Sequence, residues 1–169
     1  FDEMLEMAGA GSKVLALRCG VPTSEAEILR LASPLHDVGK VGIPDAVLNK
    51  PGKLTPEEFD VIKTHAQIGY DMLKVSKGRV LQAAAVIALQ HHERFDGSGY
   101  PHGLQANEIS DLVRIMTVSD IFGALIERRS YKPPLSAENA YKILQDMGPK
   151  LDKDLVREFG FVSQLRFQE

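Results

Sequence analysis

Cysteines, long apolar runs and signal-peptide features are scarce in the sequence, and each scarcity excludes a class of protein. The single cysteine, Cys19, has no partner for an internal disulfide, which fits a reducing cytoplasm. The longest apolar run covers residues 80–89 and is interrupted by Gln82, whereas a membrane-spanning helix needs about 20 apolar residues. The first residues do not show the basic and apolar pattern of a signal peptide. We therefore expect a cytoplasmic chain without membrane contact.

An excess of basic residues is also lacking. The net charge is −3 and the pI is about 6.0, so no global positive field attracts nucleic acid and we expect no DNA partner. An anionic ligand would have to be held by local arginine and lysine side chains. Of the 169 residues, 44% are hydrophobic and 25% are charged, which is ordinary for a folded protein. We predict a single domain over residues 1–169.

Alternating strand patterns are scarce, and helical patterns take their place. Two tetrapeptides have the form of a capping box, in which Ser24 and Thr55 would cap the helices that follow them. Helical spacing, alanine richness or a capping residue predicts further helices over residues 80–91, 109–126, 136–147 and 152–159. Loops rich in glycine and proline separate these segments. The pattern predicts an all-α fold.

The histidines are grouped in the middle of the chain, and most stand beside acidic residues or glycines: His36, His65, His91, His92 and His102. Any one of them could be an ordinary structural residue. As a group they indicate a metal site, because imidazole and carboxylate are usual ligands of zinc, iron, manganese and nickel. Adjacent helical residues diverge by about 100°, so each of the pairs His36-Asp37 and His91-His92 would address two neighbouring ions. His102 has no role that we can assign.

Several other charged residues allow both a structural and a functional interpretation. Asp120 lies within the apolar pattern of residues 109–126, where a buried carboxylate is costly without a partner, although it could face solvent or form an ion pair. Lys40 is either an exposed loop lysine or a functional cation. Arg129 and Lys132 belong either to a solvated charge run or to a phosphate-binding group, since a guanidinium matches phosphate oxygens.

Taken together, three segments resemble the bacterial HD-GYP family, a subgroup of the HD metal-dependent phosphohydrolases. They are residues 36–44 (HDVGKVGIP), residues 91–101 (HHERFDGSGYP), and Asp120 with residues 129–132 (RSYK). The resemblance runs from about residue 14 to residue 161 and implies an all-α HD-domain helical bundle with a Gly-Tyr-Pro loop beside the metal site. It also implies a cytoplasmic bacterial phosphodiesterase. Such an enzyme cleaves cyclic di-GMP, or a related cyclic dinucleotide, to the linear dinucleotide or GMP.

The resemblance further implies a set of ligands for two or three divalent ions, with iron or manganese as the expected metals. Asp37 would bridge two ions, His36 and Asp120 would bind the first, and the remaining positions would bind the second and any third: His65, His91 and His92.

The same resemblance assigns residues to catalysis and to substrate binding. Lys40 would reach the scissile phosphate, and with Asp37 it forms the predicted catalytic pair. Substrate would be contacted by the loop residues Gly99, Tyr100 and Pro101, and its phosphates would be held by Arg129 and Lys132. Two acidic residues of the second segment, Glu93 and Asp96, would orient the histidines or hold the loop.

The sequence departs from the family at one expected metal ligand. Family members carry a further histidine well before the His-Asp pair, and the corresponding position here is Met4. Either the site has lost a ligand and the domain only binds nucleotide or partner proteins, or residues near positions 4–12 are missing from the sequence, which we favour. Family domains usually receive a signal from an attached sensor or receiver domain, so we expect the chain to belong to a longer regulator. A homodimer is a further candidate.

Overall fold

Helices form nearly all of the regular structure. The computed structural model describes the backbone of residues 2–127 and 133–166, and the side chains of residues 9–127 and 133–161. Its α-helices are α1 (Asp2–Arg18), α2 (Thr23–Ala32), α3 (Asp45–Leu48), α4 (Pro56–Lys63), α5 (His65–Leu73), α6 (Arg79–Gln90), α7 (Asp111–Ile126), α8 (Ala137–Asp146) and α9 (Lys153–Arg166). Short 3-10 helices are η1 (Ser33–Leu35), η2 (Val38–Gly42), η3 (Ala106–Glu108) and η4 (Gly148–Lys150). No strand forms within the described ranges, which confirms the predicted all-α class.

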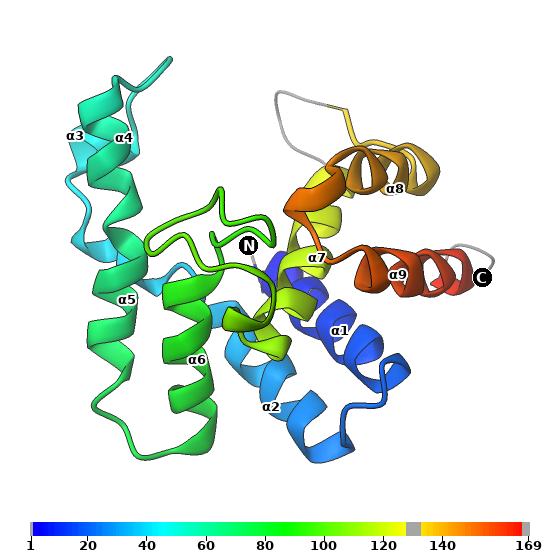
Figure 1. The fold of residues 1–169 in the computed structure, drawn as a ribbon. Helices are drawn as coiled ribbons and strands as arrows, with labels where there is room; N and C mark the ends of the chain where they lie inside the picture. The colour runs from blue at the N-terminus through cyan, green and yellow to red at the C-terminus, as the bar shows by residue number, and fades with distance from the viewer. Residues whose placement is uncertain (1, 128–132, 167–169) are drawn as a thin grey trace.

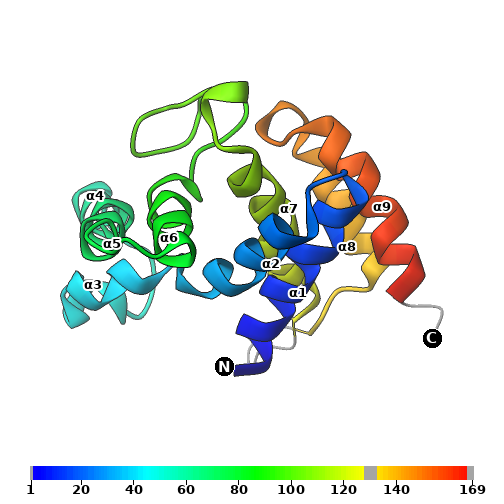
Figure 2. The ribbon, with the colours of Figure 1, turned by 90° about the horizontal axis from the view of Figure 1, so that it is seen from below.

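Two groups of helices lie on either side of the middle of the molecule. α4, α5 and α6 form one group, and α1, α2, α7, α8 and α9 form the other (Figures 1 and 2). Within the groups, α5 packs against α6, and α1 packs against both α2 and α7. The groups are joined where α2 meets α6, while η2 packs against α5. The connections that carry the expected signatures, η1–η2 and the loop between α6 and α7, therefore lie near the junction.

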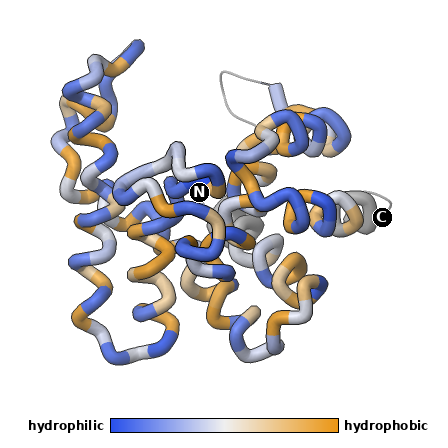
Figure 3. The backbone as a smooth tube through the Cα atoms, viewed as in Figure 1, coloured by the Kyte–Doolittle hydropathy of each residue, from blue (hydrophilic) through white to orange (hydrophobic). Residues whose placement is uncertain are grey.

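Aliphatic side chains fill the space among α1, α2, α6 and α7. Leu15, Leu29, Ile87 and Met116 are each at most 1% exposed, and burying one such side chain contributes roughly 1.5–3 kcal/mol. Short hydrophobic stretches alternate with hydrophilic ones along the tube in Figure 3. No helix among the described residues is long and apolar enough to span a membrane.

Local capping chemistry explains where some helices begin. The Thr55 hydroxyl accepts from the Glu58 amide at 3.2 Å, and the Glu58 carboxylate accepts from the Thr55 amide at 2.8 Å, which confirms that capping box. The box expected at Ser24 is wrong, because α2 begins at Thr23, two residues before the start that a Ser24 cap would give, and Pro22 occupies the N-cap position without a side-chain cap. Ser24 therefore lies inside the first turn. The helix that Thr55 caps, α4, ends at Lys63, and α5 begins two residues later at His65.

Candidate metal centre

Three histidines are fixed in one orientation by the backbone that immediately precedes them. The Nδ1 atom of His36 lies 2.7 Å from the Ser33 carbonyl oxygen, that of His65 lies 2.6 Å from the Ile62 carbonyl, and that of His91 lies 2.9 Å from the Ala88 carbonyl. A carbonyl oxygen only accepts hydrogen bonds, so each Nδ1 carries the proton and donates it. The Nε2 atom of each neutral ring is then left with a lone pair.

These Nε2 atoms converge on the Asp37 carboxylate, which lies between η1 and η2. The distance from Asp37 Oδ2 to His36 Nε2 is 3.3 Å, and Asp37 Oδ1 lies 3.4 Å from His65 Nε2 and 3.3 Å from His91 Nε2. His65 and His91 also bring their Nε2 atoms within 3.3 Å of each other. Lone pairs this close to one another and to a carboxylate repel unless a cation or a proton lies among them. The three histidine residues are at most 9% exposed, so water screens this repulsion poorly.

The other two expected ligands adjoin the same cluster. His92 joins Asp37, His65 and His91 in a group whose ligand atoms all lie within 4.8 Å of one another. Asp120, on α7, places its Oδ1 atom 3.8 Å from His36 Nε2. The structure thus brings together all six residues that the sequence singled out as metal ligands, from both groups of helices.

The protonation states of the cluster suit cation binding. Burial alone would raise the pKa of Asp37, but its contacts with His36, His65 and His91 outweigh burial and hold that pKa well below its usual range. Burial lowers the pKa of His91, and it lowers the pKa of His92 to about 2, so both rings are neutral. Burial also acts to lower the pKa of His36, but the Asp37 and Asp120 carboxylates outweigh it and raise that pKa to about 9. Where no cation is bound, a proton on His36 takes its place.

Lys40 lies at the mouth of this cluster, on η2. Its Nζ atom is 2.9 Å from Asp37 Oδ2, and its side chain is 43% exposed. The ammonium therefore shares the carboxylate oxygen that also faces His36. The side chain is exposed, as one of the two interpretations of the sequence had it, and it also pairs with the expected metal ligand Asp37.

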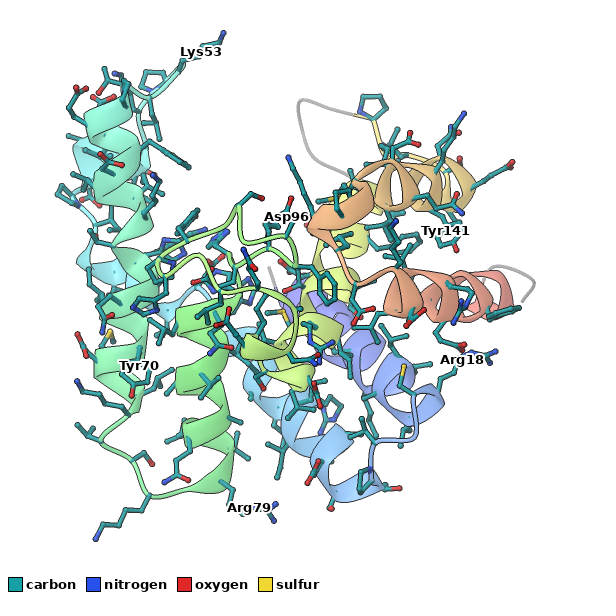
Figure 4. All side chains as sticks on the ribbon, viewed as in Figure 1. Arg18, Lys53, Tyr70, Arg79, Asp96 and Tyr141 are labelled. Carbon is teal, nitrogen blue, oxygen red and sulfur yellow. The ribbon has the colours of Figure 1, made fainter. Side chains whose placement is uncertain are left out.

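The loop after α6 closes over the histidines and is held by a buried acid. Glu93 is 2% exposed, and its carboxylate accepts from the backbone amides of His102 at 2.7 Å and Leu104 at 2.9 Å. Of the two roles expected for Glu93, holding the loop is the one that these bonds show. Asp96, labelled in Figure 4, stabilises the turn by accepting from the Ser98 amide at 3.0 Å and the Ser98 hydroxyl at 2.6 Å.

The Gly-Tyr-Pro segment lies directly against the cluster. A Cβ atom on Gly99 would lie 2.3 Å from the His92 carbonyl oxygen and 2.5 Å from the Arg94 amide nitrogen, so only glycine fits there. The Tyr100 ring stacks on the His92 ring with centroids 4.7 Å apart and 17° between the planes. Pro101 follows in an exposed position after a cis peptide bond. The sequence correctly placed this loop beside the histidines.

Two expected substrate contacts, Arg129 and Lys132, fall outside the described residues, and so does the side chain of Met4. Conversely, the structure shows neighbours of the site that sequence reasoning missed. Arg94 donates to the carbonyls of Glu93 at 3.1 Å and His91 at 3.4 Å. Phe59 and Lys63, on α4, contact Tyr100. Spacing gave no signal for Phe59 and Lys63, because Tyr100 lies far from both of them in the sequence.

Comparison with known proteins finds a family model and relatives that match most of this chain. The family model described as HD domain matches residues 2–155. The cyclic di-GMP phosphodiesterase response regulator RpfG of Xanthomonas campestris is 46% identical over 143 residues, which are 85% of this chain and 37% of that protein. The 3'3'-cGAMP-specific phosphodiesterase 2 of Vibrio cholerae is 46% identical over 137 residues, covering 77% of this chain and 26% of the relative.

A solved structure shares the fold. Bd1817, an HDG"Y"P protein from Bdellovibrio bacteriovorus, superposes with a TM-score of 0.72 at 22% identity, over 95% of this chain and 51% of that one. The chain spans well under half the length of these two curated relatives.

Proposed function

Since the chain belongs to the HD domain family and its resemblance to HD-GYP proteins is confirmed, we propose that it is a metal-dependent phosphodiesterase acting on cyclic di-GMP. The products are the linear dinucleotide, GMP or both. One observation carries the proposal: the Nε2 atoms of His36, His65 and His91 point at both oxygens of the Asp37 carboxylate. A buried group of imidazoles that faces one carboxylate fits divalent cations.

The donor set divides between two ions. Asp37 would bridge two ions if both were bound, because its Oδ2 atom faces His36 and its Oδ1 atom faces His65 and His91. Asp120 completes the side of His36, and His92 completes the other side. Imidazole and carboxylate suit iron and manganese, which are the metals that the resemblance implies. When bound, two such ions offset the charge of a phosphodiester and acidify the attacking water.

The chain's own residues bind and orient the substrate. Lys40 can leave Asp37 once the charge of that carboxylate is neutralised, and its ammonium is then available to a phosphate oxygen or to the departing ribose oxygen. Gly99, Tyr100 and Pro101 form the wall that contacts the nucleotide. We assign the phosphates that lie away from the bond being cleaved to Arg129 and Lys132, as the resemblance implies.

Lys40→Met should separate catalysis from metal binding. Loss of one positioned cation at a developing oxyanion costs about 100-fold in kcat, whereas metal content should stay at the wild-type level or rise, because the competing ammonium on Asp37 is gone. Steady-state kinetics and metal analysis of the purified variant measure both. Lys74→Met, which removes the partner of Asp71 on α5, is the matched control. Full turnover in Lys40→Met would remove Lys40 from the mechanism.

The proposed activity is tested on protein purified without oxygen. We expect cleavage of cyclic di-GMP, loss of cleavage after chelation, and recovery on addition of iron or manganese. Assays with 3'3'-cGAMP and with a nucleotide monophosphate decide the substrate class, since one relative bears the name of a cGAMP-specific enzyme. If fully metallated protein cleaved none of the three substrates, the proposal would be refuted.

A second function is favoured by one residue. Met4 stands where the family has a ligand histidine, and a domain without that ligand could bind nucleotide or partner proteins without cleaving. Binding of cyclic di-GMP by a metallated but inactive protein would identify this case. In either case we propose that the domain works in the bacterial cytoplasm under the control of an attached sensor or receiver domain, or as a homodimer.

A further inference from the structure

A row of aromatic rings leads from the metal centre to the surface. The His92 ring stacks on Tyr100, and the Tyr100 ring meets Phe59 edge to face, with centroids 6.1 Å apart and 84° between the planes. Phe59 is 43% exposed although it is a large apolar side chain. The row therefore ends in solvent.

A cation stands at the end of this row. The Lys63 ammonium lies 4.9 Å from the Phe59 ring centroid and 5.8 Å from that of Tyr100. Its ion pair with Asp60, at 3.1 Å, involves a carboxylate that is 73% exposed, and exposed pairs of this kind contribute little. Neither the exposed ion pair nor the ring contacts bind the ammonium strongly, so it remains available to another acceptor.

We infer that Phe59, Lys63 and Tyr100, here called the α4 shelf, form a guanine subsite for the cyclic dinucleotide, which rests on the proposed function. Aromatic faces bind any base by stacking, so the rings alone do not select guanine. An ammonium has three donors and no acceptor. Guanine presents two acceptors, O6 and N7, on one edge, whereas adenine places an amino donor beside N7. In a purine that lies against the rings, this edge faces Lys63. The ammonium can donate to both O6 and N7 of guanine, whereas the amino donor of adenine faces the ammonium without an acceptor between them.

The shelf is separate from the catalytic groups. Both α4 residues belong to a helix outside the three signature segments, and neither is among the side chains whose ligand atoms surround Asp37. Lys63 and Phe59 are therefore specificity residues, and their removal should change selectivity and KM rather than kcat.

The test compares cyclic di-GMP with cyclic di-AMP in four variants. We expect Lys63→Met to lower the ratio of the two kcat/KM values about 10-fold, Lys63→Arg to retain the ratio because Arg also donates to O6 and N7, and Phe59→Leu to raise KM for both substrates about 10-fold. Val61→Ala, another exposed change on α4, should alter neither quantity. Metal content is measured in each variant, because a merely structural effect on the nearby His65 would lower metal content and leave the ratio of the two substrates unchanged.

The outcomes separate the inference from the proposed function. If Lys63→Met lowered kcat/KM equally for both substrates, Lys63 would contact a phosphate and the guanine subsite would be overturned. Cleavage by the wild type would still support the proposed phosphodiesterase activity. An unchanged KM in Phe59→Leu would overturn the stacking role. If the wild type binds but does not cleave, the proposed function fails and the same ratios are read from dissociation constants measured by calorimetry. A wild type that binds neither dinucleotide would refute the subsite.

Discussion

Asp37→Asn is expected to remove bound metal and to lower turnover of cyclic di-GMP by about 1,000-fold or more, since a metal centre supplies several kcal/mol to phosphodiester cleavage. The substitution keeps the shape of the side chain and removes its charge. It also replaces one acceptor atom with an amide donor, which can satisfy the Nε2 lone pairs that face Asp37. The asparagine therefore fills the role of the cation within the fold.

The same substitution should also change how the melting temperature responds to removal of metal. Chelation should lower the melting temperature of the wild type, because ligand bound to the native state stabilises it. The melting temperature of Asp37→Asn should not respond to chelator. Metal analysis and thermal unfolding with and without chelator measure these effects. Asp71→Asn, which removes a carboxylate from the exposed face of α5, is the control. A metal content equal to that of the wild type in Asp37→Asn would disprove the bridging role.

Gly39→Ala is expected to have the largest effect on folding. A Cβ atom there would lie 1.9 Å from the His65 carbonyl oxygen and 2.5 Å from the Gly69 amide nitrogen, and both of these are backbone atoms that cannot rotate away. The alanine must push η2 off α5, which separates Asp37 from His65. We expect a loss of about 4 kcal/mol in the free energy of unfolding, at the upper end for a point substitution, together with loss of bound metal.

A second glycine of the same 3-10 helix serves as the comparison. A Cβ atom on Gly42 would meet side-chain atoms of Ile68 at 3.0 and 3.1 Å, and a side chain can shift, so Gly42→Ala should cost about 1 kcal/mol or less. Chemical denaturation of both variants measures the difference. If Gly39→Ala unfolded at the same denaturant concentration as Gly42→Ala and kept its metal, the close approach of η2 to α5 would not be what positions Asp37.

Features that depend on a few neighbouring residues could be predicted from the sequence, whereas contacts between distant segments could not. The capping box at Thr55 rests on four consecutive residues, and it formed as expected. The similar pattern at Ser24 failed because Pro22, just outside it, is the N-cap, and the helix starts two residues earlier than a Ser24 cap predicts. The contact between Phe59 and Tyr100 could not be predicted from local sequence, because Tyr100 comes from a distant loop.

The candidate site shows the same limit. Residue chemistry indicated that the histidines bind metal, but spacing alone could not show that His36, His65 and His91 meet at one carboxylate, since they follow η1, begin α5 and follow α6. The resemblance to a family supplied that convergence, and the structure confirms the proximity of these side chains. Their tautomers, fixed by the carbonyls of Ser33, Ile62 and Ala88, could be read only from the folded backbone.

Anomalous diffraction from crystals of protein loaded with iron or manganese tests the central claim most directly. We predict a peak bonded to Asp37, His65 and His91 through Nε2 and carboxylate oxygen at about 2.0–2.2 Å, as first-row metals bind these groups, and a second peak on the side of His36 and Asp120. Metal bound elsewhere on the chain, with the Nε2 atoms around Asp37 bridged only by protons, would contradict the account.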